Sequence, residues 1–158
     1  MKKNIIYVIF TSLILGFCCF ETNNLAVCAA PNKTTTVQQV KPINVTPLGV
    51  VNAPSKYLNK TVKMQATFDK FSTLGLDYSK ALRKSSDYIG ILIQRDDVVD
   101  HNIPLSEMKM FMKKEMAQKH IDLDTGDKIE ITAKVFSTAL NDPWLDIQKL
   151  VVIQKVKK

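Results

Sequence analysis

Apolar and polar side chains alternate along residues 61–68, and this period of two predicts a half-buried β-strand. The apolar side chains of this strand are Val62, Met64, Ala66 and Phe68. The apolar phase then slips by one residue before Phe71, which is the effect of a β-bulge in a bent strand. Residues 87–94 predict another strand, and Gly90 within it indicates tight curvature or a close neighbour. These features are typical of a small, strongly bent sheet.

The C-terminal part of the chain predicts two further strands that form a hairpin. Gly126 and Asp127 mark a turn, and alternation follows in residues 129–135. A second turn at Asn-Asp-Pro, residues 141–143, leads into a strand whose apolar phase changes at Lys149. A strand that changes faces midway belongs to a closed or strongly coiled sheet. We expect one core, lined by Val62, Met64, Phe68, Ile91, Ile129, Ile131, Val135 and Ile147.

Two segments predict helices. Thr46 followed by Pro47 is a typical start for a short helix. In residues 103–120, Ser106 is a candidate N-cap, and apolar side chains recur at helical spacing. These side chains are Leu105, Met108, Phe111, Met112 and Met116. Residues 72–86 predict no clear strand, and we expect a long excursion there.

The first 29 residues have the form of a secretory signal, with a basic start followed by an apolar run. Cleavage after Ala29 is our expectation, and an uncleaved membrane anchor is the alternative. Residues 30–43 are polar and predict a flexible linker, and residues 44–158 predict a single folded domain. We therefore expect an exported protein, periplasmic or extracellular.

Composition limits both the chemistry and the partners. All 3 cysteines lie in the predicted signal, so the folded domain has neither a disulfide framework nor a thiol. The domain is nevertheless long enough to bury a stable core without disulfide bonds. The net charge of the whole chain is +7 at pH 7, which favours anionic partners but also serves solubility.

Three stretches resemble OB-fold domains of the tRNA-anticodon type: YLNKTVKMQATF (57–68), GDKIEITAKVFS (126–137) and LDIQKLVVIQ (145–154). The resemblance covers roughly residues 55–155. It implies a mainly β fold, an OB-fold-like small Greek-key barrel with one helix before the last two strands and a short N-terminal helix. Such a barrel needs one strand more than the pattern shows, so either a strand lies within residues 72–86 or the barrel is incomplete. The resemblance implies a binding surface and no reaction.

Groups that could carry catalysis or bind a metal have weak support. A cluster of acidic residues with one histidine consists of Asp96, Asp97, Asp100 and His101. Nothing in the pattern brings their side chains together, and aspartate in a loop ordinarily caps a turn. Ser106 and Lys109 have the Ser-x-x-Lys spacing of serine acyl-enzymes, but the partner motifs of that class are absent. We expect no catalysis, no metal site and no cofactor.

On an OB barrel, ligands usually lie across the second and third strands, between the first and last loops. The residues that the resemblance places there combine aromatic rings with cations, which suits stacked bases or sugar rings. The candidate ligand-binding surface consists of Tyr78, Lys80, Arg83, Lys84, Tyr88, Arg95, Asn141 and Trp144. Trp144 lies on the polar phase of its strand, so it either caps the barrel or offers a flat face to a ligand. We expect the cap.

These observations predict an exported, monomeric and non-catalytic binding module without a membrane span after signal cleavage. Its expected ligand is a protein or a cell-envelope polymer. The alternative is an OB domain that binds single-stranded nucleic acid. Binding to phosphates weakens as salt rises, so a salt titration separates the two hypotheses.

Overall fold

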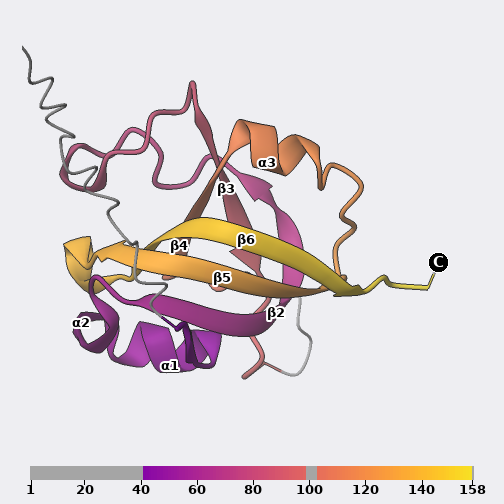
Figure 1. The fold of residues 1–158 in the computed structure, drawn as a ribbon, viewed down its shortest axis with the longest axis horizontal. Helices are drawn as coiled ribbons and strands as arrows, with labels where there is room; N and C mark the ends of the chain where they lie inside the picture. The colour runs from indigo at the N-terminus through magenta and orange to yellow at the C-terminus, as the bar shows by residue number, and fades with distance from the viewer. Residues whose placement is uncertain (1–40, 99–102, 158) are drawn as a thin grey trace, which may run out of the picture. The chain divides into compact units, whose positions relative to one another are not determined.

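The computed structural model describes residues 41–98 and 103–157 (Figure 1). The strands are β1 (Ile43–Asn44), β2 (Thr61–Ser72), β3 (Tyr88–Ile93), β4 (Lys109–Lys113), β5 (Lys128–Ser137) and β6 (Trp144–Gln154). The helices are α1 (Pro47–Asn52), α2 (Pro54–Tyr57) and α3 (Lys114–Gln118). Short 3₁₀ turns lie at Ser79–Ala81 and Ala139–Asn141.

Strands β2 to β6 close into a barrel. They follow the order β2, β3, β4, β6, β5, and β5 pairs with β2 to complete the ring. β4 and β6 run parallel, whereas the other pairs in the ring are antiparallel. This is the strand order of an OB-fold, with α3 between the third and fourth strands of the ring along the chain. The predicted fold class, a mainly β OB-like barrel with short helices, is confirmed.

Strand β2 contributes to both halves of the barrel because it bends at a bulge. Residues 61–67 pair with β5, and beyond them Phe68 and then residues 70–72 pair with β3. The register shifts between Phe68 and Lys70, so the bulge predicted before Phe71 is confirmed. The bend lets a single strand supply inward side chains to two parts of the wall.

The barrel interior holds one hydrophobic core. Every residue predicted to line this core is buried in a single cluster. From outside the ring, α1 adds Val50 to the cluster, and Met116 of α3 packs against it. Figure 1 shows α1 beside β2, with α3 on the opposite side of the barrel. The short helices therefore cover parts of the core that the strands leave open.

The helix predicted within residues 103–120 is wrong over most of its length. Residues 109–113 form β4, and α3 begins only after them. Ser106 lies in the turn before β4 and caps no helix. The strand that the pattern lacked is therefore β4. It does not lie within residues 72–86, where the structure has the end of β2 and a 3₁₀ turn.

The reason for this error is that β4 is buried on both faces. Met110 and Met112 point into the barrel core, whereas Phe111 packs against other side chains outside the barrel. A strand covered on both sides shows no alternation of apolar and polar residues. Its short apolar run then has no period that distinguishes it from a buried helix.

The first helix begins where the sequence predicted it. Thr46 caps α1, its Oγ1 accepting the Gly49 N–H at 3.2 Å, and Pro47 occupies the first turn. Ile43, at the end of the predicted linker, pairs with Val62 of β2. The predicted signal and the rest of the linker up to residue 40 lie outside the described residues. Among those described, no helix combines the length and the apolar character that crossing a bilayer requires.

The turn before β5 is fixed by a buried carboxylate. Asp127 is fully buried and accepts the backbone N–H groups of Asp124 at 3.0 Å and Val156 at 2.9 Å. Lys155 Nζ lies 3.1 Å from the same carboxylate. Burial raises the pKa of Asp127, but these hydrogen bonds and the ammonium group outweigh burial, so the pKa lies below its usual value. The carboxylate thus links the turn to the segment that follows β6.

Strand β6 changes faces as predicted. Leu145 and Ile147 point into the core near its start, and Leu150 does so near its end. The pairing with β5 shifts by one residue between Ile147 and Lys149, which marks a bulge. The face change at Lys149 is therefore confirmed.

Candidate functional site on the outer face of the barrel

Aromatic side chains gather outside the barrel, near the junction of β3, β4 and the start of β6. Phe111 and Trp144 are buried there although they point away from the barrel core. Tyr88 of β3 and Phe136 of β5 pack beside them. The second and third strands of an OB barrel, here β3 and β4, carry its ligands. This aromatic cluster therefore occupies the position of a ligand-binding face.

The loop between β2 and β3, residues 73–87, folds over the aromatic cluster, and we call it the covering loop. Its Tyr78 ring stacks on Trp144 with the centroids 5.3 Å apart and the planes at 20°. Gly75 approaches so closely that a Cβ atom there would lie 3.2 Å from both Phe111 and Trp144. Gly75 also has a φ of +82°, which glycine adopts without strain. The covering loop thus fills the space that a stacked ligand would need.

Trp144 is buried beneath the covering loop, in a cluster outside the barrel core. Its side chain is 1% exposed, and its Nε1 donates to the Ala139 carbonyl at 2.7 Å. The Phe111 ring also packs against Trp144, with the two ring centroids 5.9 Å apart. A tryptophan this buried offers no free face to a ligand.

Arg83 fastens the covering loop to the barrel wall. Its Nε donates to Asp146 of β6 at 2.7 Å, and Nη2 donates to the second oxygen of the same carboxylate. The guanidinium carbon lies 3.8 Å from the centroid of the Phe136 ring, a cation–π contact. The hydrogen bond to Asp146 raises the pKa of Arg83 above its usual value. A bidentate pair of this geometry fixes the loop more firmly than a single surface contact.

The structure brings together only part of the predicted ligand-binding surface. Tyr78, Arg83 and Trp144 do meet, with Tyr88 close to the Arg83 guanidinium at 5.7 Å. The Tyr78 and Trp144 rings, however, stack on each other, and the Arg83 guanidinium is directed at Asp146, whereas Tyr88 also lines an open recess. The side chains of the predicted surface that remain exposed are Lys80, Lys84 and Asn141.

Arg95 lies apart from the other predicted site residues. It follows the opposite end of β3 from Tyr88 and donates to Asp97 at 3.0 Å and to Glu107 at 2.6 Å. The hydrogen bonds to these two carboxylates raise its pKa. Arg95 therefore takes part in a local ion-pair cluster, away from the aromatic face.

An open recess remains beside the covering loop, and we call it the lysine recess. Its volume is about 480 Å³. It is lined by Ser86, Asp87, Tyr88, Lys113, Lys114 and Glu115. The Lys114 N–H donates to the Asp87 carbonyl at 2.9 Å, which ties the covering loop to the junction of β4 and α3. Tyr88 is half-buried and forms part of the wall.

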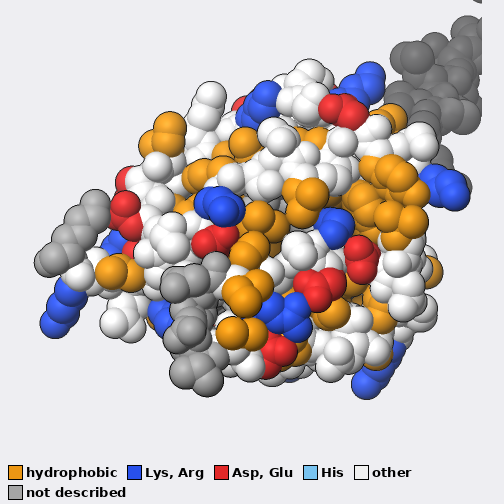
Figure 2. Space-filling view, turned by 180° about the vertical axis from the view of Figure 1, so that it is seen from behind, with side chains coloured by type: hydrophobic (Ala, Val, Ile, Leu, Met, Phe, Trp, Pro, Cys, Tyr) orange, Lys and Arg blue, Asp and Glu red, His pale blue; other side chains and the backbone are white. Residues whose placement is uncertain are grey.

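Sequence reasoning missed Lys113 and Lys114 because it placed both in a long helix. Within the described ranges neither lysine forms an ion pair. No signal in the pattern separated them from a helix, because residues 110–112 are all apolar and show no alternation. Figure 2 shows positive and negative side chains interspersed on the face turned away in Figure 1, so that face carries no broad positive field.

Metal chemistry finds no support in the described part of the chain. Across residues 41–98 and 103–157, no three His, Cys, Asp or Glu side chains form a group that could hold a metal ion. Of the acidic cluster noted in the sequence, Asp97 is paired with Arg95. Asp100 and His101 lie outside the described residues.

Comparison with known proteins gives likenesses in structure alone. No protein-family model matches the chain, and no curated protein sequence is similar to it. A candidate aspartyl-tRNA synthetase from Leishmania major superposes with a TM-score of 0.49 and 15% identity, covering 82% of this chain and 24% of the synthetase chain. For asparaginyl-tRNA synthetase from Pyrococcus horikoshii the TM-score is 0.46 at 15% identity, covering 72% of this chain and 23% of that one.

A smaller protein is also similar in structure. An OBody, solved bound to hen egg-white lysozyme, superposes with a TM-score of 0.43 and 8% identity, covering 64% of this chain and 88% of its own. The present chain thus spans about a quarter of the synthetase chains that it matches. Its assignment as an OB-like barrel rests on its own strand order.

Proposed function

We propose that this domain is a non-catalytic OB-type module that binds single-stranded nucleic acid at the lysine recess. The observation that supports this proposal is the position of the recess. It lies where β3 begins and β4 ends, and the covering loop leaves it open. These are the strands on which an OB barrel carries its ligand. Lys113 and Lys114 supply ammonium groups there, with Tyr88 as the adjacent ring.

The expected binding is weak and depends strongly on salt. Lysines attract phosphates and release counterions when they bind them. Asp87 and Glu115 line the same recess and offset part of the positive charge. Only Tyr88 remains to stack on a base, because Tyr78 and Trp144 already stack on each other. Contacts to phosphates carry no sequence information, so we expect little sequence preference.

The test is a titration of the full chain with a fluorescein-labelled oligothymidylate of about 20 nucleotides, followed by anisotropy. Affinity should fall clearly between about 50 mM and 200 mM salt. Lys113→Gln should weaken binding and reduce the slope of log K against log salt by about 0.7, the value for one phosphate contact on a single strand. Lys149→Gln, an exposed lysine on the outer face of β6, is the matched control and should leave both unchanged.

Two results would contradict the proposal. One is the absence of binding at the lower salt concentration. The other is salt-dependent binding that Lys113→Gln and Lys149→Gln reduce equally, because a general charge effect would then explain it.

A protein or cell-envelope component is the second candidate ligand. The observation that favours it is an apolar pocket on another part of the barrel surface, beside α3. Export remains our proposal for localisation, and its support is the signal-like sequence of residues 1–29. Fractionation of the native cells with an antibody to the folded domain tests it, and a signal only in the cytoplasmic fraction would contradict it.

A further inference from the structure

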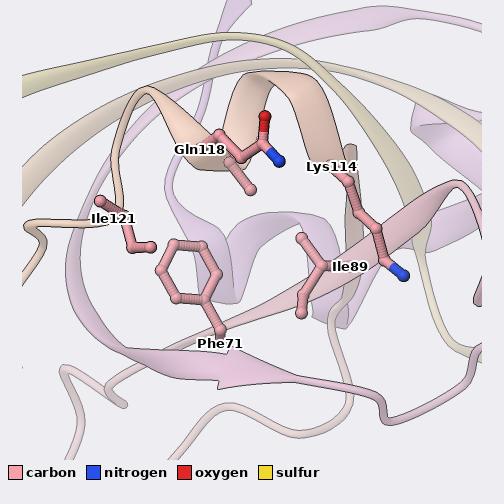
Figure 3. A pocket seen from close by; sticks show the side chains of 6 residues that line it. Phe71, Ile89, Lys114, Gln118 and Ile121 are labelled. Carbon is pink, nitrogen blue, oxygen red and sulfur yellow. The ribbon is translucent and has the colours of Figure 1, made fainter.

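An apolar pocket lies between α3 and the strands β2 and β3 (Figure 3). Phe71 and Ile89 form the side nearer the barrel, and Ala117, Gln118 and Ile121 form the side belonging to α3 and the turn after it. Ile121 is 79% exposed, the largest exposed fraction among the large apolar side chains described. Apolar surface of this kind gains free energy when a partner covers it.

Residues on both sides of the pocket are packed against the barrel core. Met116 and Ala117 of α3 pack against the barrel core, as do Phe71 and Ile89. The two sides of the pocket are therefore anchored independently in the same core. A ligand that enters the pocket meets a preformed surface and loses little affinity to reorganisation.

The size of the pocket limits its occupant. The cavity volume is about 260 Å³. Sites for drug-sized molecules and cofactors usually measure roughly 300–1,000 Å³. One or two apolar side chains suit this pocket better than a cofactor does.

The charge at the rim further defines the occupant. Lys114 is the one charged residue among the described residues that line the pocket, and no carboxylate does so. Figure 3 shows its side chain extending from α3 past Ile89. Lys114 also lines the lysine recess, so the two hollows adjoin at this side chain. A group that leaves the pocket on this side meets an ammonium group, and a carboxylate complements it.

We propose that the apolar pocket docks an acidic peptide segment of a partner protein, with one bulky apolar side chain inserted between Phe71 and Ala117. A carboxylate next to that side chain lies at Lys114. The Gln118 carboxamide, at the edge of the pocket, can both donate to and accept from the peptide backbone. A nucleic-acid base fits this pocket less well, because its polar edges would meet mainly apolar atoms. The apolar pocket adjoins the lysine recess at Lys114, but peptide docking does not require nucleic-acid binding at the recess.

The test is a titration of the full chain, labelled with ¹³C at alanine and isoleucine methyl groups, with one defined peptide. The probe is a decapeptide in which a single phenylalanine is flanked by glutamates. The methyl signals of Ile89, Ala117 and Ile121 should shift in a saturable way, and that of Ala139 beside Trp144 should not. Peptides with serine in place of phenylalanine, or lysines in place of the glutamates, should each bind about tenfold more weakly or worse.

Matched variants locate the peptide on the protein. Ile121→Ser removes an exposed apolar side chain and should weaken the peptide about fivefold to tenfold without disturbing the fold. Leu140→Ser is the control, since Leu140 is comparably exposed at 70% but lies in the turn before β6. Lys114→Gln should weaken the glutamate peptide and should not weaken the peptide with lysines in place of the glutamates any further. Ala117→Glu, which places a carboxylate in the pocket, should abolish the shifts.

Three outcomes would overturn the proposal. The glutamate–phenylalanine peptide could leave the three methyl signals unmoved, or Ile121→Ser and Leu140→Ser could bind it equally well. Alternatively, the labelled oligothymidylate could shift these methyl groups while the peptide does not, which would assign the pocket to nucleic acid. Peptide shifts with no oligothymidylate binding to the wild type would support the peptide site alone, whereas peptide shifts that persist in a Lys113→Gln variant with weakened oligothymidylate binding would support both sites, so the two proposals fail separately.

Discussion

Replacing Trp144 with alanine removes a side chain that is 1% exposed and lies against two other aromatic rings. Truncation of a buried tryptophan to alanine costs about 3–5 kcal/mol through lost transfer free energy and the cavity that remains. The Ala139 carbonyl also loses the Nε1–H donor that now lies at 2.7 Å. We therefore expect the free energy of unfolding to fall by about 4 kcal/mol.

Urea denaturation followed by circular dichroism measures this loss directly. For a domain of this size, each kcal/mol shifts the melting temperature by about 3–5 °C, so a fall of about 10–20 °C should accompany it. Trp144→Phe is the matched control. It keeps an apolar ring beside Tyr78 and loses the hydrogen bond, so it should cost only about 1–2 kcal/mol.

Two measurements can refute this reasoning. An unfolding free energy for Trp144→Ala within about 1 kcal/mol of the wild type would mean that the ring is not part of the packed structure. Tryptophan emission at the wavelength of a fully solvated indole in the native protein would mean the same, because Trp144 is the only tryptophan in the chain.

Three further predictions test other parts of the structure. Ile131→Ala should cost about 2–5 kcal/mol in urea melts because the side chain is fully buried, and a loss under about 1 kcal/mol would mean that the strand phase is wrong. Gly75→Ala should cost about 1–2 kcal/mol in the same assay, given its positive φ and the ring contacts a Cβ would make, and unchanged stability would contradict the position of the covering loop. The pKa of Asp127 is lowered by folding, so its stabilising effect is present above the unfolded pKa of about 3.9 and is lost as pH falls through the folded value. In acid melts, the wild type should therefore lose stability more steeply below about pH 4 than Asp127→Asn does, and parallel curves would count against the buried turn.

The strands that face solvent on one side were predictable from the sequence. Along β2 and β5, side chains such as Met64 and Ile131 point into the core, and the intervening positions are polar because water covers the other face. The period of two is a direct consequence of that one-sided burial. It fixes the phase of the strand and with it the identity of the core residues.

Strand β4 could not be recognised in this way. Phe111 is apolar because the covering loop lies outside it, and this burial depends on residues far away in the chain. The three apolar residues from Met110 to Met112 then carry no alternation. The local pattern does not show which distant loop will cover a strand. For this reason the fifth strand of the barrel was not predicted from the sequence.

Part of the candidate site was predictable from the sequence and part was not. The OB resemblance correctly brought Tyr78, Arg83 and Trp144 to one face. It could not predict that these side chains bind one another and Asp146. The sequence of a loop does not show whether its aromatic and guanidinium groups contact a ligand or other residues of the chain. Lys113 and Lys114 escaped notice for a different reason, namely the misassigned helix around them.

The closure of the barrel has a consequence for how the protein folds. Thr61 of β2 faces Lys134 of β5, and β6 supplies the neighbour of both β4 and β5. Pairing strands that are far apart in the sequence closes long loops. The entropy cost of closing them comes before the contacts stabilise the chain, so folding is slow. Until β6 is synthesised, β4 and β5 each present an open sheet edge to other chains. A nascent or truncated chain that ends before Trp144 should therefore aggregate rather than fold into a smaller domain.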